Sequence, residues 1–142
     1  MSWFIAPTVS LCEQQRDAIT ACLPVPVGLI SGALQPDQWS DENLWKQTVA
    51  THRVIVSTPQ VLLDALRHGY VNLGRDIGLL VFDEAHHASD NHPYNVIMRE
   101  FYVFCDPEGP VRAYPNRMRP SVLGLTASPT FGGDIHNAFR CV

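Results

Sequence analysis

The sequence predicts an α/β domain in which a doubly wound parallel β-sheet is flanked by helices. Short apolar runs alternate along the chain with segments of helical periodicity. The runs are rich in β-branched residues or leucine and mostly do not alternate with polar residues, a pattern typical of parallel strands covered on both faces. Polar residues directly follow three of these runs. Since ligands bind beyond the carboxyl ends of strands in open α/β sheets, these three places are the first candidates for a functional site.

Five strands and four helices are expected, in strict β-α alternation. The apolar runs place the strands at residues 3–6, 27–31, 53–57, 78–82 and 122–125. The helical spacing of apolar residues places the helices at residues 8–23, 36–50, 59–68 and 94–104.

Local signals mark the ends of two of these helices. Thr8 or Ser10 can cap the start of the first helix, Pro59 suits the first position of the third, and Gly69 suits its end. Residues 105–120 carry four prolines and three arginines, and they are expected to form an exposed loop before the last strand.

Length and composition favour one folded domain. A chain of 142 residues can bury a real core, and 46% apolar with 17% charged residues argues against disorder. The formal net charge of −4 predicts no general attraction to nucleic acid. Any contact with nucleic acid must therefore come from local geometry.

The cysteines and the amino-terminal residues indicate the cellular compartment of the protein. The four cysteines form no C-x-x-C pair and no short-spaced zinc pattern, which predicts reduced thiols in an intracellular protein, cytoplasmic or nuclear. The first residues lack the basic region of a signal peptide, and no apolar stretch approaches the length of a membrane span. No membrane partner is expected.

The run at 78–82 ends in Asp83-Glu84-Ala85-His86, which suits nucleotide hydrolysis. Asp83 can hold Mg²⁺ through water, because this hard cation prefers oxygen ligands. Glu84 can orient and deprotonate the attacking water. The alternative is that two acidic residues simply begin a helix. The apolar strand directly before them favours the hydrolytic interpretation.

The histidines raise a second alternative, a zinc hydrolase. Zinc proteases place two histidines four residues apart with a glutamate between them. Here Glu84 precedes His86 and His87, which are adjacent and would diverge on a helix, so the sequence disfavours a zinc site. His87 and His92 are expected to be surface or loop histidines.

Two further strand ends carry hydroxyl groups. Residues 53–57 lead into Thr58 and Pro59, and residues 122–125 lead into Thr126-Ala127-Ser128-Pro129. Alone, the second segment would be a hydroxyl-capped turn before a proline. Its position after an apolar strand, downstream of Asp-Glu-Ala-His, favours a place in the site.

Together these segments resemble the motifs of superfamily 2 helicases, in the right order and over nearly the whole chain. The four matches are Ala6-Pro7-Thr8 with Leu11 and Gln14-Gln15 for motif Ia, Ser57–Leu62 for motif Ib, Asp83–His86 for motif II (the Walker B box) and Thr126–Pro129 for motif III. Within that superfamily the chain resembles the DExH-box Dicer and RIG-I-like branch. Residues 52–58, 82–87 and 92–98 are most similar to the helicase ATP-binding domain of fungal Dicer-like proteins.

The resemblance implies a RecA-like sheet and roles in ATP hydrolysis. Asp83 would act on Mg²⁺ through water and Glu84 would be the catalytic base. His86, Thr126 and Ser128 would couple the state of the nucleotide to the grip on RNA.

The resemblance also implies contacts with an RNA backbone, made by Thr8, Gln15 and Thr58 with neighbouring backbone amides. Contacts of that kind recognise shape and not sequence, which suits double-stranded RNA.

One element of such a motor is missing from the sequence. A phosphate-binding loop needs Gly-x-x-x-x-Gly-Lys-Ser/Thr, and the only lysine, Lys46, has no glycine nearby before it. Residues 1–142 would therefore be a partial first RecA-like helicase ATP-binding domain, from motif Ia to motif III. Its sheet would be incomplete, because the strand before the phosphate loop is missing and its neighbours would expose unpaired backbone groups.

The expected function is part of an ATP-dependent RNA helicase or translocase module of a Dicer-like protein, acting on double-stranded RNA in RNA silencing. In a complete parent domain the module would use ATP and Mg²⁺ and work with a second helicase domain, whereas the isolated chain is expected not to hydrolyse ATP. The alternative is a non-catalytic chain that binds RNA or a helicase partner. An unrelated α/β hydrolase using Asp83, Glu84 and the histidines is disfavoured.

Overall fold

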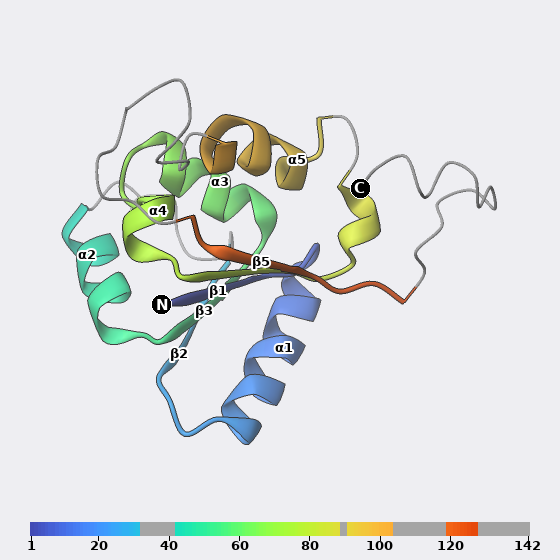
Figure 1. The fold of residues 1–142 in the computed structure, drawn as a ribbon. Coiled ribbons are helices and arrows are strands. Elements are labelled where there is room, and N and C mark those ends of the chain that lie inside the picture. The colour runs from blue at the N-terminus through green and yellow to red at the C-terminus, as the bar shows by residue number, and fades with distance from the viewer. Residues whose placement is uncertain (32–41, 89–90, 104–118, 128–142) are drawn as a thin grey trace.

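A computed structural model describes residues 1–31, 42–88, 91–103 and 119–127. Five parallel strands form one sheet in the order β2-β3-β1-β4-β5 (Figure 1). Their bounds are Ser2–Ile5 (β1), Val27–Ile30 (β2), Val54–Ser57 (β3), Leu79–Phe82 (β4) and Ser121–Gly124 (β5). All five predicted strands are confirmed, with ends that differ by about one residue, as is usual for such boundaries.

The helices connect these strands. They are Val9–Cys22 (α1), Glu42–Thr51 (α2), Pro59–Arg67 (α3), Leu73–Asp76 (α4) and Pro93–Ile97 (α5), with a short turn Ala85–His87 (η2) and a wider helical turn Met98–Tyr102 (η3). The predicted helix 94–104 is thus split between α5 and η3. Residues 36–41 of the predicted second helix lie outside the described residues, as does nearly all of the predicted loop 105–120.

Helix ends follow the local signals in the sequence. Thr8, and not Ser10, caps α1, since its Oγ1 accepts a hydrogen bond from the amide of Leu11 at 3.3 Å. Pro59 is the first residue of α3. Gly69 follows that helix with φ of +73°, a conformation that glycine adopts without steric cost.

Two apolar clusters cover the two faces of the sheet. Trp3, Ile5 and Leu80 belong to the larger cluster, which takes in α3, α4, α5 and Trp45 of α2. The smaller one is built around Ala6, Cys12 and Val56, under α1. Figure 1 shows the same layers, with α1 on one face of the sheet and α3, α4 and α5 on the other.

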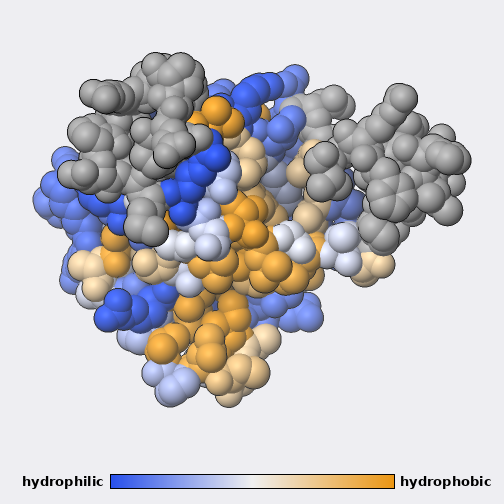
Figure 2. Space-filling model, viewed as in Figure 1, coloured by the Kyte–Doolittle hydropathy of each residue, from blue (hydrophilic) through white to orange (hydrophobic). Residues whose placement is uncertain are grey.

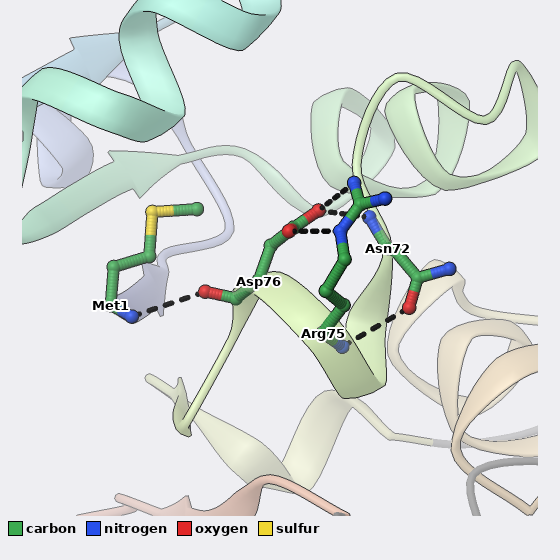
Figure 3. A network of polar contacts seen from close by, with 4 residues as sticks. All are labelled: Met1, Asn72, Arg75 and Asp76. Atoms are coloured by element: carbon green, nitrogen blue, oxygen red, sulfur yellow. Dashed lines mark hydrogen bonds and ion pairs between the residues drawn. The ribbon is translucent and has the colours of Figure 1, made fainter. Parts of the chain in front are cut away.

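Helix α4, which was not predicted from the sequence, is a single turn held by polar contacts (Figure 3). Asn72 caps it through the amide of Arg75, and Asp76 accepts from the amide of Asn72 and from the Arg75 guanidinium. The amino group of Met1 donates to the carbonyl of Asp76 at 3.1 Å. These contacts tie the start of β1 to the segment that leads into β4.

Strand β5 departs from the prediction of strands covered on both faces. All four of its residues are exposed, and 40% of Val122 and 48% of Leu123 are accessible to solvent. Apolar residues gather in the middle of the face in Figure 2, where β5 runs in Figure 1. Within the described residues β5 pairs only with β4, so its other edge is open.

None of the helices in the described part of the chain is both long and apolar enough to cross a membrane.

Candidate functional site

The predicted site residues follow strands that end side by side. Ile5 is in register with Ser57 of β3 and with Phe82 of β4, and Phe82 is in register with Gly124 of β5. Because these strands are parallel, the residues after each of them lie along one edge of the sheet. The candidates at 6–8, 58, 83–86 and 126 therefore share one edge, as the strand-end rule predicts.

Three hydrogen bonds hold the carboxylate and the backbone amide of Asp83. Its Oδ1 accepts from the amide of Glu84 at 3.0 Å, and its Oδ2 accepts from Gln15 Nε2 at 3.1 Å. Its own amide donates to the carbonyl of Ile5 at 2.8 Å. The carboxylate is therefore held in one orientation by residues from α1 and from its own segment.

Tyr94 supports the same segment from beneath, a role that the sequence did not predict. Its side chain is fully buried, and its hydroxyl donates to the carbonyl of Asp83 at 2.8 Å and is 3.3 Å from that of Ile5. Burial, with the charge of Asp83 second, raises the pKa of this phenol. The only sequence signal for this role was the position of Tyr94 in an apolar helical pattern, which indicates burial. A buried tyrosine usually has a hydrogen-bond partner for its hydroxyl, but the sequence does not identify that partner.

Glu84 adopts a left-handed conformation, with φ of 50° and ψ of 49°. Among the described residues it is the one non-glycine residue with positive φ, and such conformations persist where their surroundings hold them and often mark functional sites. Only the three-residue turn η2 follows, and the Glu84 side chain makes no capping bond to it. This geometry does not support the alternative that Asp83 and Glu84 merely begin a helix.

His86 joins the segment after β4 to the segment after β5. Its Nδ1 lies 3.0 Å from Thr126 Oγ1 and 3.2 Å from Glu84 Oε2. A proton on Nδ1 suits both contacts, because an ionised carboxylate can only accept. The amide of Ala85 also donates to the carbonyl of Leu125 at 2.8 Å. The predicted coupling residue Ser128 lies outside the described residues.

A glycine allows the two segments to approach this closely. A Cβ atom on Gly124 would lie 3.1 Å from the Cβ of Ala85, closer than carbon atoms normally pack. A side chain at position 124 would require Ala85 or the end of β5 to shift by a few tenths of an ångström.

Three histidine rings lie next to one another at this site, and those of His87 and His92 are stacked. The ring centroids of His86 and His87 are 4.2 Å apart, those of His87 and His92 are 6.0 Å apart, and His92 meets Tyr94 edge-on. Burial lowers the pKa of His92, with a smaller contribution from His87. Its Nδ1 accepts from the amide of Tyr94, as a neutral ring can.

The described residues give the zinc alternative no support. No group of three histidine, cysteine, aspartate or glutamate side chains within that part of the chain is arranged to hold a metal ion. His87 and His92 instead line an open cavity of about 490 Å³, whose lining comprises Pro7, Thr8, Leu11, Glu84, His86, His87 and His92.

The predicted RNA-contacting residues occupy different settings. Thr8 caps α1 and lines the cavity. Thr58 precedes α3, and its hydroxyl makes no capping bond there. The side-chain amide of Gln15 points to Asp83 instead of standing free. An RNA contact at any of the three stays a prediction.

The donor set at Asp83 fits a hydrated Mg²⁺. A carboxylate offers about four lone-pair positions, so the bonds from Gln15 and the Glu84 amide leave room for waters of a cation. This chain offers fewer residues that could bind the phosphate groups of a nucleotide. Lys46, the only lysine, is paired with Glu42 on α2.

Three comparisons with known proteins agree on a family. The family model of the DEAD/DEAH box helicases matches residues 2–133. The chain is 45% identical over 139 residues to Dicer-like protein 2 of Cryphonectria parasitica and 47% identical over 129 residues to Dicer-like protein 2 of Coccidioides immitis. These matches cover 97% and 90% of this chain but only 9% of each relative.

Among solved structures, the helicase domain of Pyrococcus furiosus Hef matches with a TM-score of 0.68 and 30% sequence identity. The match covers 98% of this chain and 26% of that one. The parallel sheet flanked by helices is therefore the RecA-like fold of a helicase domain, as predicted. The chain spans a small fraction of the length of these relatives.

Proposed function

Because this chain belongs to the DEAD/DEAH box helicase family, we propose that it forms part of an ATP-dependent RNA helicase or translocase module that acts on double-stranded RNA in RNA silencing. Its partners are then double-stranded RNA and a second helicase domain, and its location is the cytoplasm or nucleus. The observation that carries the proposal is the constrained cluster at the edge of the sheet, where Asp83, Glu84, His86 and Thr126 meet.

The cluster suits the activation of water for attack on a phosphoryl group. ATP and Mg²⁺ supply that group and the cation when they are bound. Asp83 would hold the cation through water with a carboxylate that Gln15 and the Glu84 amide keep in place. Glu84 would orient a water and accept its proton. His86 is in contact with both Glu84 and Thr126, so it can relay a change at the base to the end of β5.

RNA contacts are proposed on the same edge of the sheet. Thr8 and Thr58 follow the neighbouring strands β1 and β3, and each precedes a helix whose first amides have no partner within the helix. Such amides and hydroxyls can donate to phosphate oxygens without reading sequence. The net charge of −4 means that this contact is weak and is best seen at low salt.

A non-catalytic role is the second candidate, and one observation favours it. The sequence holds no phosphate-binding loop, and its single lysine pairs with Glu42 on the exposed surface of α2. The chain would then bind RNA or a helicase partner without turning over nucleotide.

Two measurements on the chain test these roles. Binding of a short RNA duplex, followed by fluorescence anisotropy in a salt series, is expected to weaken with salt and on Thr58→Ala. The matched control is Thr20→Ala, an exposed threonine on α1 whose hydroxyl bonds only to its own helix. No binding at low salt, or equal losses in both variants, would contradict the RNA contact.

ATP turnover is measured on the same preparation, with and without the duplex. No hydrolysis is expected from the chain alone. Turnover that Glu84→Gln abolishes would overturn this expectation and the non-catalytic alternative together.

A further inference from the structure

We propose that Gln15 is a positioning residue that orients the Asp83 carboxylate and links the RNA-facing start of α1 to the nucleotide-facing end of β4. The inference deepens the proposed function and rests on it. It is carried by a contact between residues that are 68 positions apart in the chain, the 3.1 Å bond from Gln15 Nε2 to Asp83 Oδ2.

One face of α1 reaches both places. Thr8, Leu11 and Gln15 are spaced by three and then four residues, so they lie on the same side of the helix. Thr8 and Leu11 line the cavity that Glu84 and His86 also line. About two turns further along, at a rise of about 1.5 Å per residue, the same side presents Gln15 to Asp83.

The chemistry of an amide fits this role. Gln15 donates a hydrogen bond and carries no charge, so it fixes Oδ2 without neutralising the carboxylate that would face a cation. A lysine or arginine at this position would form an ion pair with Asp83 and compete with that cation. Glu84 holds the other oxygen through its amide, and the half-buried Gln15 is the only side chain seen to donate to this carboxylate among the described residues.

Helix α1 connects the proposed RNA contact at Thr8 with the hydrogen bond between Gln15 and Asp83. α1 is one continuous helix of 14 residues that packs on β2 and β3, so a displacement of its first turn would be transmitted along its length. A phosphate bound at Thr8 would pull on the first turn of α1, and Gln15 would shift against Asp83. The backbone of Glu84 would register that shift, because its amide donates to the other oxygen of Asp83.

The test follows individual signals by nuclear magnetic resonance while a short RNA duplex is added to the whole chain. In the wild-type chain, the backbone amide of Glu84 and the side-chain amide of Gln15 are expected to shift together with the signals around Thr8. In Gln15→Leu and Gln15→Glu, which both remove the donor, the shift at Glu84, measured with the duplex at saturation, is expected to fall by about half or more. Gln14→Leu, at the exposed neighbouring position, is the matched control and should keep the wild-type response.

The possible outcomes distinguish a failure of the proposed function from a failure of the proposed role of Gln15. If the wild-type chain binds no RNA, the proposed function fails and this inference fails with it. If RNA binds but the Glu84 and Gln15 signals stay still, or if Gln15→Leu keeps the shift at Glu84, only the inference is overturned. A purely structural Gln15 would lower the stability of the chain and leave the RNA-dependent shift intact. The wild-type signals decide the matter even if the variants fold poorly.

Discussion

His86 Nδ1 lies 3.0 Å from Thr126 Oγ1, although 40 positions separate the two residues. The contact closes the gap between the segments that follow β4 and β5. Without it, the Asp83–His86 segment would be connected to the last strand chiefly through the bond from the Ala85 amide to the Leu125 carbonyl. The same imidazole nitrogen lies 3.2 Å from Glu84 Oε2, so one ring contacts both the proposed base and Thr126.

Thr126→Val tests this connection by removing the hydroxyl at nearly constant volume. The ring ¹⁵N signals of His86 are expected to shift, because Nδ1 loses the Thr126 hydroxyl and keeps its contact with Glu84. The free energy of unfolding should fall by less than about 1 kcal/mol, because the bond is exposed to solvent.

A matched control exists in the same chain. Thr51 Oγ1 lies 3.1 Å from His52 Nδ1, so Thr51→Val should move the signals of His52 and leave those of His86 unchanged. Unchanged His86 signals in Thr126→Val would show that the contact is not maintained in solution.

Tyr94→Phe tests the support beneath Asp83. The variant keeps the ring packed against Phe82 but leaves the Asp83 carbonyl without its buried donor. The free energy of unfolding, from urea denaturation, is expected to fall by about 1–2 kcal/mol, the usual cost of an unsatisfied buried group.

Tyr70→Phe is the comparison for that experiment. Tyr70 stacks on Trp45 and keeps those ring contacts as phenylalanine, so a change within about 0.5 kcal/mol is expected. Equal losses in the two variants would argue against a specific role of the Tyr94 hydroxyl.

The strands and the location of the site were predictable because both follow from local patterns. Each apolar run forms a strand. The rule that ligands bind beyond the carboxyl ends of parallel strands predicted that Asp83 and Thr126 lie at one edge of the sheet, and they do. Thr8 and Pro59 marked helix starts because capping and proline preferences act within a few residues.

The remaining features depend on contacts between distant residues. The left-handed conformation of Glu84 could not be predicted from its residue type, because glycine and asparagine are the residues that usually adopt this conformation. The bond from Gln15 to Asp83 and the buried hydroxyl of Tyr94 exist only after the sheet forms. Helix α4 is too short for helical periodicity and is held instead by polar contacts, one of them with Met1.

Cys12 is predicted to be an unreactive thiol. It is fully buried under α1, and burial raises its pKa from 9.0 to about 11. Because the folded-state pKa is raised, the fold favours the protonated thiol, and this contribution to stability is lost as the pH rises from 9 to 11.

Alkylation at pH 8, followed by peptide mass mapping, measures this difference. Cys12 should react at least about tenfold more slowly than Cys22, which is exposed at the end of α1, because the thiolate is the reactive form. In urea the two rates should become similar. Similar rates in the folded chain would mean that α1 opens readily or that Cys12 is not buried.

Strand β5 pairs on one side only within the described part of the chain, and this edge predicts that the chain associates with itself at high concentration. Leu123 is in register with Val81, Phe4 and Val56 and so lies on the α1 face of the sheet, whereas Val122 is in register with Leu80 on the other face. Backbone amides of Ser121 and Leu125 donate toward β4, so by the alternation of a strand the amide and carbonyl groups of Val122 and Gly124 face outward. Among the described residues, the outward backbone groups of this apolar edge have no strand partner and the strand contains no charged residue, and such an edge is a template for another strand.

Leu123→Lys places a charge on that edge and is expected to shift the chain toward the monomer in sedimentation velocity across a concentration series. Leu44→Lys is the matched control, because Leu44 is 42% exposed on α2, close to the 48% of Leu123, but does not lie on a strand. If the gain came only from added charge, both variants would reduce association equally. A wild-type chain that stays monomeric at every concentration would show that the β5 edge is protected in solution, and the expectation of an open edge would then be wrong.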